Sequence, residues 1–546
     1  MKRYIALAIL AITYSVGLKA QNDILPSRSL TIEGNYNPSV TDAGKIMPVP
    51  DKPHQERQTV SVSYNTAVNP YTGTERKPMV TFGSLSDSVS KPSHTGLVRF
   101  GYGLRNLSDG LLDFKWNISE RDVLQISGAM NGWSSKPDGE WRSGMFVADL
   151  AALYSHRFNS FTLSVDGAYG HSSYNFMPGV AMDSARRSVS DLTLKTDRRR
   201  LGLSLSGRKD QVEWFGMASM EWLTRGSLVL NGVERDNSER LLRIAAGASM
   251  PMAEGIAGID YRQKYAVLNW TGLNGCSYRN FTTVTLSPHW VRHWDGVDAS
   301  FGINLDIRSR AGHKFMMSPQ ITVGHTINDR FRLDAGMVGG LIDNNIRSLA
   351  LISPYWSEEE RIRDGYELMN LFVGVSYRKS NLVNMSFKAG YRHTIDELFQ
   401  DRADSLIVTS MLRQHSSDVL YARLDADFQF SDRSQIKFDM TYNDYLGRFI
   451  GGYMRLKPAF DGNLYGRTIL MPGLEMMLSY RLMAFHRVNG KAMPTVNDLA
   501  VTADYDLTEK LSFYATLRQL LGGNYYYYAG YRALKPSFML GATYRF

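Results

Sequence analysis

The chain has 546 residues, a formal net charge of +9 and one cysteine, Cys276. Acidic and basic residues are interspersed, so nucleic acid is not an expected partner. The single cysteine excludes an internal disulfide. Beyond the N-terminus no apolar run reaches about 18 residues, which excludes a helical membrane domain. Aromatic residues are 12% of the chain, glycine occurs 47 times and the mean hydropathy is −0.27. That composition is typical of membrane β-barrels, in which only alternate residues face lipid.

Residues 1–20 read MKRYIALAILAITYSVGLKA. A basic start, an apolar stretch and a small residue before a polar segment are the features of a secretory signal peptide. We therefore expect cleavage after Ala20 and a location outside the cytoplasm, which the barrel pattern described below narrows to the cell outer membrane. No cysteine lies near this point, which argues against a lipid-anchored protein.

Residues 21–94 are rich in Pro, Ser, Thr and Asn and show little apolar periodicity. They predict a mostly irregular N-terminal segment, extended in the periplasm or in a lumen. A compact motif within this segment is predicted to dock, either inside the lumen or on a periplasmic or lipoprotein partner, while a plain linker is the alternative. Its residues are Tyr36, Asn37, Pro38, Asp42, Lys45 and Ile46.

From residue 95 to residue 546 the sequence alternates between apolar and polar residues with period two. In VDASFGINLDIR, for example, Phe301 and Ile307 share one parity, whereas Ser300 and Asp306 share the other. Such runs match the roughly 9–11 residues that a tilted strand needs to cross a bilayer. The pattern predicts an all-β fold, a transmembrane antiparallel β-barrel with apolar residues facing lipid and polar residues facing the lumen.

Short polar turns alternate with longer irregular stretches along the barrel region, which is the outer-membrane arrangement. Nine short turns predict 20 strands, and a tenth turn hidden between Ser431 and Thr508 would give 22. The nine turns are Ser119–Asp122, Asn159–Ser160, Gly207–Asp210, Pro251–Gly255, His293–Gly296, Asn328–Arg330, Lys379–Asn381, Ser431–Ser434 and Thr508–Lys510. The long stretches, expected as outer loops, are 170–190, 223–238, 342–365, 393–417 and 446–468.

The terminal stretch FMLGATYRF predicts a last strand that closes against the first, since a barrel leaves no exposed edge. Its apolar residues also match the signal by which barrel insertion machinery recognises outer-membrane barrels. The residues of this predicted insertion signal are Phe538, Leu540, Tyr544 and Phe546.

The last fifty residues resemble the end of a TonB-dependent receptor barrel. Asn497 and Asp498 open a strand, a turn follows at Thr508–Lys510, and Leu520 and Leu521 precede a tyrosine, although Gln519 stands where those receptors often have Asn. The motif around Tyr36–Pro38, with TGLVRFGYG as the opening strand, resembles plugless TonB-receptor-like barrels of the Bacteroidota. The resemblance implies a fold and a location, and residues 21–94 are too few for a receptor plug.

No residue pattern predicts chemistry: the sequence has no HExxH, P-loop or CxxC motif, and His171 beside Ser172 has no identifiable acid partner. We therefore expect no enzyme, no catalytic residue, no metal and no cofactor. Two other features have the chemistry to make outside contacts. Arg198–Arg200 could form a basic rim for phosphate groups of lipopolysaccharide, and Tyr525–Tyr528 could stack on sugars or belong to an aromatic girdle.

Two functions remain open. The first is a barrel of the transport class, a porin-like or TonB-receptor-like conduit without a plug. The alternative is a structural or assembly barrel that anchors an outer-membrane complex through its N-terminal segment. Conductance in planar bilayers would separate them, and in both cases the surrounding partners are outer-membrane lipid and lipopolysaccharide.

Overall fold

The computed structural model describes the chain from residue 95 to residue 546, with short gaps. The gaps are residues 137–142, 179–191, 227–236, 253, 270–279, 310–313, 359–361, 380–381, 405–406, 447–457, 486, 489–490 and 529. The signal peptide and the docking motif predicted above lie outside the described residues.

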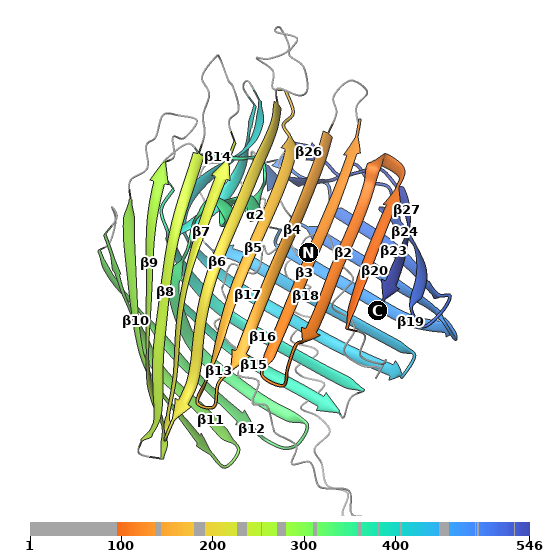
Figure 1. The fold of residues 1–546 in the computed structure, drawn as a ribbon. Coiled ribbons are helices and arrows are strands. Elements are labelled where there is room, and N and C mark those ends of the chain that lie inside the picture. The colour runs from red at the N-terminus through yellow and green to blue at the C-terminus, as the bar shows by residue number, and fades with distance from the viewer. Residues whose placement is uncertain are drawn as a thin grey trace, which may run out of the picture. The chain divides into compact units, whose positions relative to one another are not determined.

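The described residues form a closed antiparallel barrel of 22 strands, within the predicted range of 20–22, with one short α-helix, α2 (Ile346–Ile352) (Figure 1). The first barrel strands are β1 (Gly96–Gly103), β2 (Leu107–Asn117), β3 (Asp122–Ser135), β4 (Ser143–Arg157), β5 (Phe161–Asn175), β6 (Thr193–Lys209), β7 (Val212–Arg225), β8 (Asn237–Met252), β9 (Gly255–Asn269), β10 (Phe281–Trp294) and β11 (Val297–Arg308). The others are β12 (Phe315–Thr326), β13 (Phe331–Ile342), β15 (Gly365–Lys379), β16 (Val383–Asp404), β17 (Val408–Ser431), β18 (Ser434–Leu446), β19 (Phe460–Met471), β20 (Leu474–Ala484), β23 (Val496–Asp506), β24 (Leu511–Arg518) and β27 (Ser537–Arg545).

The barrel closes where the first and last strands meet. β1 pairs antiparallel with β27 from Leu97↔Arg545 to Gly103↔Met539, and with β2 on its other side. The terminal stretch is therefore the closing strand, as its alternation predicted. No strand edge of the barrel is left without a neighbour, which removes the aggregation risk of an open sheet.

The two faces of the wall follow the predicted parities, because residues paired across an antiparallel ladder share a face. Phe301 pairs with Trp290 on one side and Ile321 on the other, and its side chain is 41% exposed. On the opposite face Arg332 contacts Asp298 at 2.6 Å. An apolar outer surface around a polar, charged interior is the pattern of a barrel in the outer membrane.

The positions of the short turns also agree with the prediction. The hidden tenth turn lies between β19 and β20, where Gly473 has a φ of +83° that favours glycine. The ends joined by short turns are taken as periplasmic and the opposite ends as extracellular. In the described residues no helix is long and apolar enough to span a membrane.

The predicted outer loop at 393–417 is wrong. These residues belong to the hairpin of β16 and β17, which extends well beyond the neighbouring strands. A register shift between Thr394 and Glu397 breaks the alternation of apolar and polar residues, so the sequence pattern lost its period at that point. The predicted loop 170–190 likewise begins later, because β5 continues to Asn175 and includes His171.

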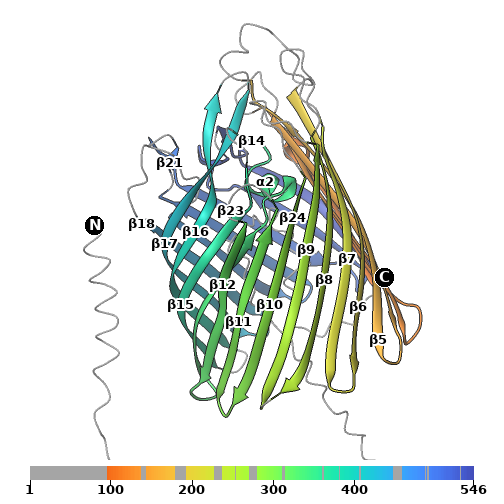
Figure 2. The same ribbon diagram turned by 90° about the vertical axis from the view of Figure 1, so that its left-hand side faces the viewer.

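The segment between β13 and β15 enters the barrel instead of leaving it. It carries α2 and the short strand β14 (Trp356–Glu358), which pairs parallel with β17 from Trp356↔Ser410 to Glu358↔Leu412. Figure 2 shows α2 and β14 within the ring of strands, toward the extracellular end. We call residues 343–364 the insert.

Smaller elements complete the described residues. They are the 3₁₀ turn η3 (Leu104–Asn106), β21 (Arg487–Val488) with β22 (Lys491–Ala492), and β25 (Tyr526–Tyr528) with β26 (Tyr531–Arg532). The last pair lies in the connection between β24 and β27, residues 519–536, which we call the tyrosine loop.

Candidate functional site at the extracellular mouth

Backbone contacts cross the extracellular mouth of the barrel. The N–H of Val408 donates to the carbonyl oxygen of Met177 at 2.9 Å, and Pro178 forms an isolated bridge with Ile407. Met177 follows the fifth barrel strand, whereas Val408 begins the sixteenth, so the two chain segments start half a ring apart. The extended hairpin of β16 and β17 must therefore lean across the opening.

A buried aromatic cluster joins the insert and the tyrosine loop at the same place. The rings of Tyr355 and Tyr531 stack with centroids 3.5 Å apart and an interplanar angle of 6°. The hydroxyl of Tyr531 donates to the Val408 carbonyl at 2.6 Å and accepts from the Met177 N–H at 3.2 Å. Around them pack Phe176, Leu192, Leu194, Ile407 and Val408, with Tyr174, Met177 and Tyr528 beside the cluster. We call this group the mouth cluster.

The insert is held at both ends by one lysine of the barrel wall. The Nζ of Lys264, on β9, donates to Asp343 at 2.5 Å and to Asp364 at 3.0 Å. Arg243, on β8, contacts Asp343 at 3.2 Å. Because Lys264 is only 7% exposed, its charge is well shielded from water. These ion pairs hold the first and last residues of the insert against the same patch of inner wall.

The electrostatics of Asp343 favour the ionised form. Burial would raise the pKa of its carboxyl group, but the charges of Lys264 and Arg243 outweigh that effect and lower the pKa to about 2. Asp343 is thus an anion over the whole physiological pH range.

The start of α2 is also fixed by the wall. Asn345 caps the helix by accepting from the N–H of Ser348 at 2.9 Å, and Ser348 donates back to the Asn345 carbonyl. The N–H of Ile346 donates to the buried carboxyl group of Glu239, on β8, at 2.9 Å. A short helix gains little from propensity alone, so these contacts and its packing hold it in place.

One face of the insert packs on an apolar part of the inner wall. Arg225, on β7, places its guanidinium 4.0 Å from the ring centre of Trp356 and donates to the Trp356 carbonyl at 2.9 Å. The buried cluster includes Leu223, Leu241, Ala266, Leu268 and Phe281 from the wall, Ile346, Leu349, Ile352, Trp356 and Ile362 from the insert, and Leu398 and Leu412 from the extended hairpin. A dry core of this kind makes the insert part of the folded barrel.

The tyrosine loop has its own anchor on the opposite stretch of wall. Tyr527 donates to the Asp498 carboxyl group on β23, and Tyr525 packs with Met483 and Val496. Burial raises the pKa of Tyr527 well above its usual value. Tyr525, Tyr527 and Tyr528 therefore pack inside the mouth, and for these three the prediction of an outer sugar platform or lipid girdle is wrong.

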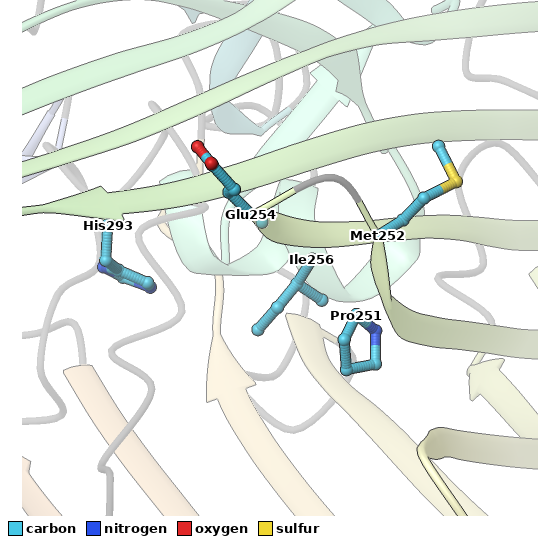
Figure 3. Close-up of a pocket in the computed structure, with 6 residues that line it drawn as sticks. Pro251, Met252, Glu254, Ile256 and His293 are labelled. Atoms are coloured by element: carbon cyan, nitrogen blue, oxygen red, sulfur yellow. The ribbon is translucent and has the colours of Figure 1, made fainter.

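Chemistry of other kinds has little support in the described residues. No group of three or more His, Cys, Asp or Glu side chains there is placed to hold a metal ion. Figure 3 shows a shallow pocket at the opposite end of the barrel, around the turn from β8 to β9. It is lined by Pro251, Met252, Glu254, Gly255, Ile256 and His293, and Glu254 is engaged by Arg292.

Three of the predicted insertion residues lie on the outer face of β27, and the fourth, Phe546, directly follows this strand. Phe538, Leu540, Tyr544 and Phe546 are 46%, 60%, 49% and 38% exposed, as expected of lipid-facing side chains. Their role as an insertion signal stays a prediction. The predicted docking residues Tyr36, Asn37, Pro38, Asp42, Lys45 and Ile46 lie outside the described residues, and their role also stays a prediction.

Sequence reasoning missed the residues that hold the insert. In the sequence, Lys264 of the wall is 79 positions from Asp343 and 100 positions from Asp364, and no short motif joins them. The sequence did contain one indication. Lys264 has the inward-facing parity of β9 and lies near the extracellular end of that strand, and the insert has an aspartate at each end, Asp343 and Asp364. Without the topology, that coincidence could not be recognised.

Solved structures similar to this chain include two receptors and a transporter. The siderophore receptor PirA from Acinetobacter baumannii is 13% identical, with a TM-score of 0.64, and the match covers 83% of this chain and 80% of that chain. The ferric enterobactin receptor PfeA from Pseudomonas aeruginosa, in complex with enterobactin, is 11% identical with a TM-score of 0.63, covering 83% and 81%. The copper transporter OprC is 10% identical with a TM-score of 0.60, covering 83% and 80%.

No protein-family profile and no characterised protein sequence matches the chain. At such low identities the structural likeness shows the barrel fold alone. It confirms the resemblance to TonB-dependent receptors for the 22-strand barrel. The barrel and its apolar outer surface locate the protein in the outer membrane.

Proposed function

We propose that this protein is a transport-class conduit of the outer membrane, porin-like or TonB-receptor-like and without a plug, whose extracellular mouth is closed by its own loops. The observation that carries the proposal is the contact of Met177 with Val408 from opposite sides of the ring, sealed by the mouth cluster. A barrel of this size encloses a lumen too wide for wall side chains to fill. Closure by the insert and the tyrosine loop then controls access to the lumen.

The inner wall supports an aqueous path below the closure. It carries many ion pairs between neighbouring strands, such as Arg467 with Glu475 at 2.6 Å and Arg481 with Asp461 at 3.0 Å. Paired charges along a polar wall suit water and hydrophilic solutes and disfavour apolar ones. The structurally similar proteins are receptors and a transporter, in keeping with a function other than catalysis.

The decisive experiment removes the insert. Ile342 pairs with Gly365 across the β13–β15 ladder, so a short glycine-containing turn can replace residues 343–364 without breaking the wall. We expect low conductance of the intact protein in planar bilayers and large, steady conductance of the shortened one. Leu351→Ala, on the exposed face of α2, is the matched control and should behave like the intact protein.

The alternative function is a structural barrel that anchors a complex through its N-terminal segment. The closed mouth is compatible with this alternative, because a structural anchor needs no open path through the barrel. If the shortened protein, with residues 21–60 also removed, is folded and inserted yet still fails to conduct, the conduit is refuted and the anchor becomes the better explanation. Proteins that co-purify with the intact chain and are lost on removal of residues 21–60 would support it.

A further inference from the structure

A row of aromatic and basic residues crosses four neighbouring strands on the outer face of the barrel. In the ladder register Tyr169, on β5, pairs with Arg199, on β6; Arg199 pairs with Trp222, on β7; and Trp222 pairs with Arg240, on β8. Residues in such a row share one face of the wall. Adjacent strands are about 4.8 Å apart, so the two arginines are separated by roughly 10 Å at the backbone.

The row lies directly above the apolar band. The corresponding row two residues nearer the periplasm contains Gly167, Leu201, Met220 and Leu242, and these three large side chains are exposed to the outside. Aromatic residues such as Tyr169 and Trp222 mark the boundary between acyl chains and head groups. Arg199 and Arg240 therefore lie at the head-group level of the outer leaflet.

Lys195 adds a third positive charge, four residues beyond Arg199 on the same outward parity of β6. All three basic side chains are exposed, and no acidic group of the described residues lies within ion-pair distance of them. The inward-facing neighbours behave differently: Arg198 contacts Glu221 at 2.6 Å and Arg200 contacts Asp166 at 3.4 Å. Of the predicted basic rim Arg198–Arg200, only Arg199 is available to an outside ligand.

The concentration of charge is local. In the extracellular half of the described barrel wall, setting aside the extended β16–β17 hairpin, the ladder registers place no other Lys or Arg on the outer face. One acid shares the site, Asp197, but it accepts hydrogen bonds from Tyr169 at 2.8 Å and His171 at 2.9 Å. With His171 neutral the outer set keeps a net charge of two positive units.

We propose that Lys195, Arg199 and Arg240 bind the phosphate groups of an acylated, phosphorylated glycolipid of the outer leaflet, with its acyl chains lying along Leu201, Met220 and Leu242. Guanidinium groups pair with phosphate oxygens through two parallel hydrogen bonds, and a basic residue gains attraction near an anionic lipid surface. The proposal depends on the membrane location and not on whether the barrel conducts.

The test measures lipid A binding to the purified full-length protein in detergent by native mass spectrometry. Arg199→Gln with Arg240→Gln should bind diphosphorylated lipid A roughly 30-fold more weakly than the intact protein, if each basic residue contributes as typical at a charged lipid surface. Lys209→Gln, which removes an outward-facing charge at the periplasmic end of the same strand, is the matched control and should bind as tightly as the intact protein. Arg199→Lys with Arg240→Lys keeps both charges and should retain most of the affinity.

Three outcomes would overturn the proposal. Equal binding of diphosphorylated lipid A to the intact protein and the Gln variant would show that these arginines play no part. Equal binding of dephosphorylated lipid A would show that the acyl chains alone drive association. Displacement by equimolar inorganic pyrophosphate would identify a free-phosphate site instead of a lipid site. Retained heat-modifiable migration on gels establishes that each variant is folded.

Discussion

Tyr355 and Tyr531 stack face to face at 3.5 Å, although one belongs to the insert after β13 and the other to the tyrosine loop before β27. The hydroxyl of Tyr531 also bonds to Val408 of the extended hairpin and to Met177 after β5. One side chain thus connects four separate segments. The Tyr531 side chain therefore couples these segments, and its removal should release more than one of them.

We therefore predict that Tyr531→Ala opens the mouth. Removing a buried aromatic side chain of this size costs about 3–5 kcal/mol, a large fraction of the stability of a locally folded cap. Tyr531→Phe keeps the stack and loses only the two hydrogen bonds, at roughly 1–3 kcal/mol. Single-channel recordings should show frequent opening for the Ala variant and brief, rarer openings for the Phe variant. Identical recordings from both variants and the intact protein would contradict a closure held by this contact.

The second prediction concerns the lysine that holds the insert. Lys264→Met leaves Asp343 and the buried Asp364 without their shared cation, and breaking a buried ion pair from one side costs about 3–5 kcal/mol. The insert should leave the wall and become accessible to trypsin at Arg347 in the folded barrel. Lys437→Met removes a more exposed inner-wall lysine that contacts Asp427 at 3.2 Å, and serves as the control. Protection of the insert in both variants would show that its apolar face alone holds it.

The third prediction is a pH dependence of closure. In the docked insert the pKa of Asp343 is lowered to about 2, whereas a released Asp has a value near 3.9. The docked state is therefore stabilised by this group above about pH 3.9, and the contribution is lost as the pH falls toward 2. Conductance should rise over that interval. Asp343→Asn should already show raised conductance at pH 7 and lose this part of the pH dependence; an unchanged profile in that variant would assign the effect to other groups.

The fourth prediction tests the assignment of the two faces. Phe301→Arg or Leu424→Arg places a charge toward lipid near mid-strand and should cost about 2–4 kcal/mol. Ser300→Arg points into the lumen and should be far milder. Equilibrium unfolding in urea from lipid vesicles gives the three values. Comparable losses for Phe301→Arg and Ser300→Arg would mean that the outer face does not meet hydrocarbon.

The strands of the barrel wall could be predicted from the sequence because each one repeats the same local alternation of apolar and polar residues. Alternation along β11 or β17 is set by lipid on one side and water on the other, and the pattern needs no knowledge of neighbours. The same rule led to a count of 20–22 strands, although the turn at Gly473 was expected only somewhere between Ser431 and Thr508. It failed at Thr394, where a bulge shifts the parity, and a loop was predicted in place of a hairpin.

The closure of the mouth could not be predicted from the sequence, because it depends on contacts between residues that are far apart in the chain. Tyr355 with Tyr531 and Lys264 with Asp343 are pairs brought together by the closing of the ring, and neither partner has a distinctive neighbourhood in the chain. Tyr525–Tyr528 stood out as a run, but whether such a run faces sugars, lipid or the lumen depends on the direction in which its loop folds. That direction is fixed by partners such as Asp498 on another strand.

The last prediction concerns residues 21–94, which we propose dock inside the lumen. In the described part of the chain, the inner face of β24 and β27 contains polar atoms that are buried and have no hydrogen-bond partner. Nη1 of Arg518 and the hydroxyl of Thr543 are two of them, on side chains 7% and 5% exposed. Buried donors and acceptors of this kind are normally satisfied by a partner, and a segment docked in the lumen would supply one.

Docking in the lumen would leave residues 21–60 protected from protease in the purified barrel, and their deletion would raise the conductance of the protein lacking the insert. Tyr36→Ala with Ile46→Ala should reproduce part of that effect if the motif makes the contact, whereas substitution of Ser84 and Ser86 by Ala, outside the motif, should not. A segment that stays cleavable, and whose deletion removes co-purifying proteins without altering conductance, would assign it to a periplasmic or lipoprotein partner instead. If deletion changes neither conductance nor co-purification, the segment is a linker and the order of residue types from Tyr36 to Pro48 has no binding role.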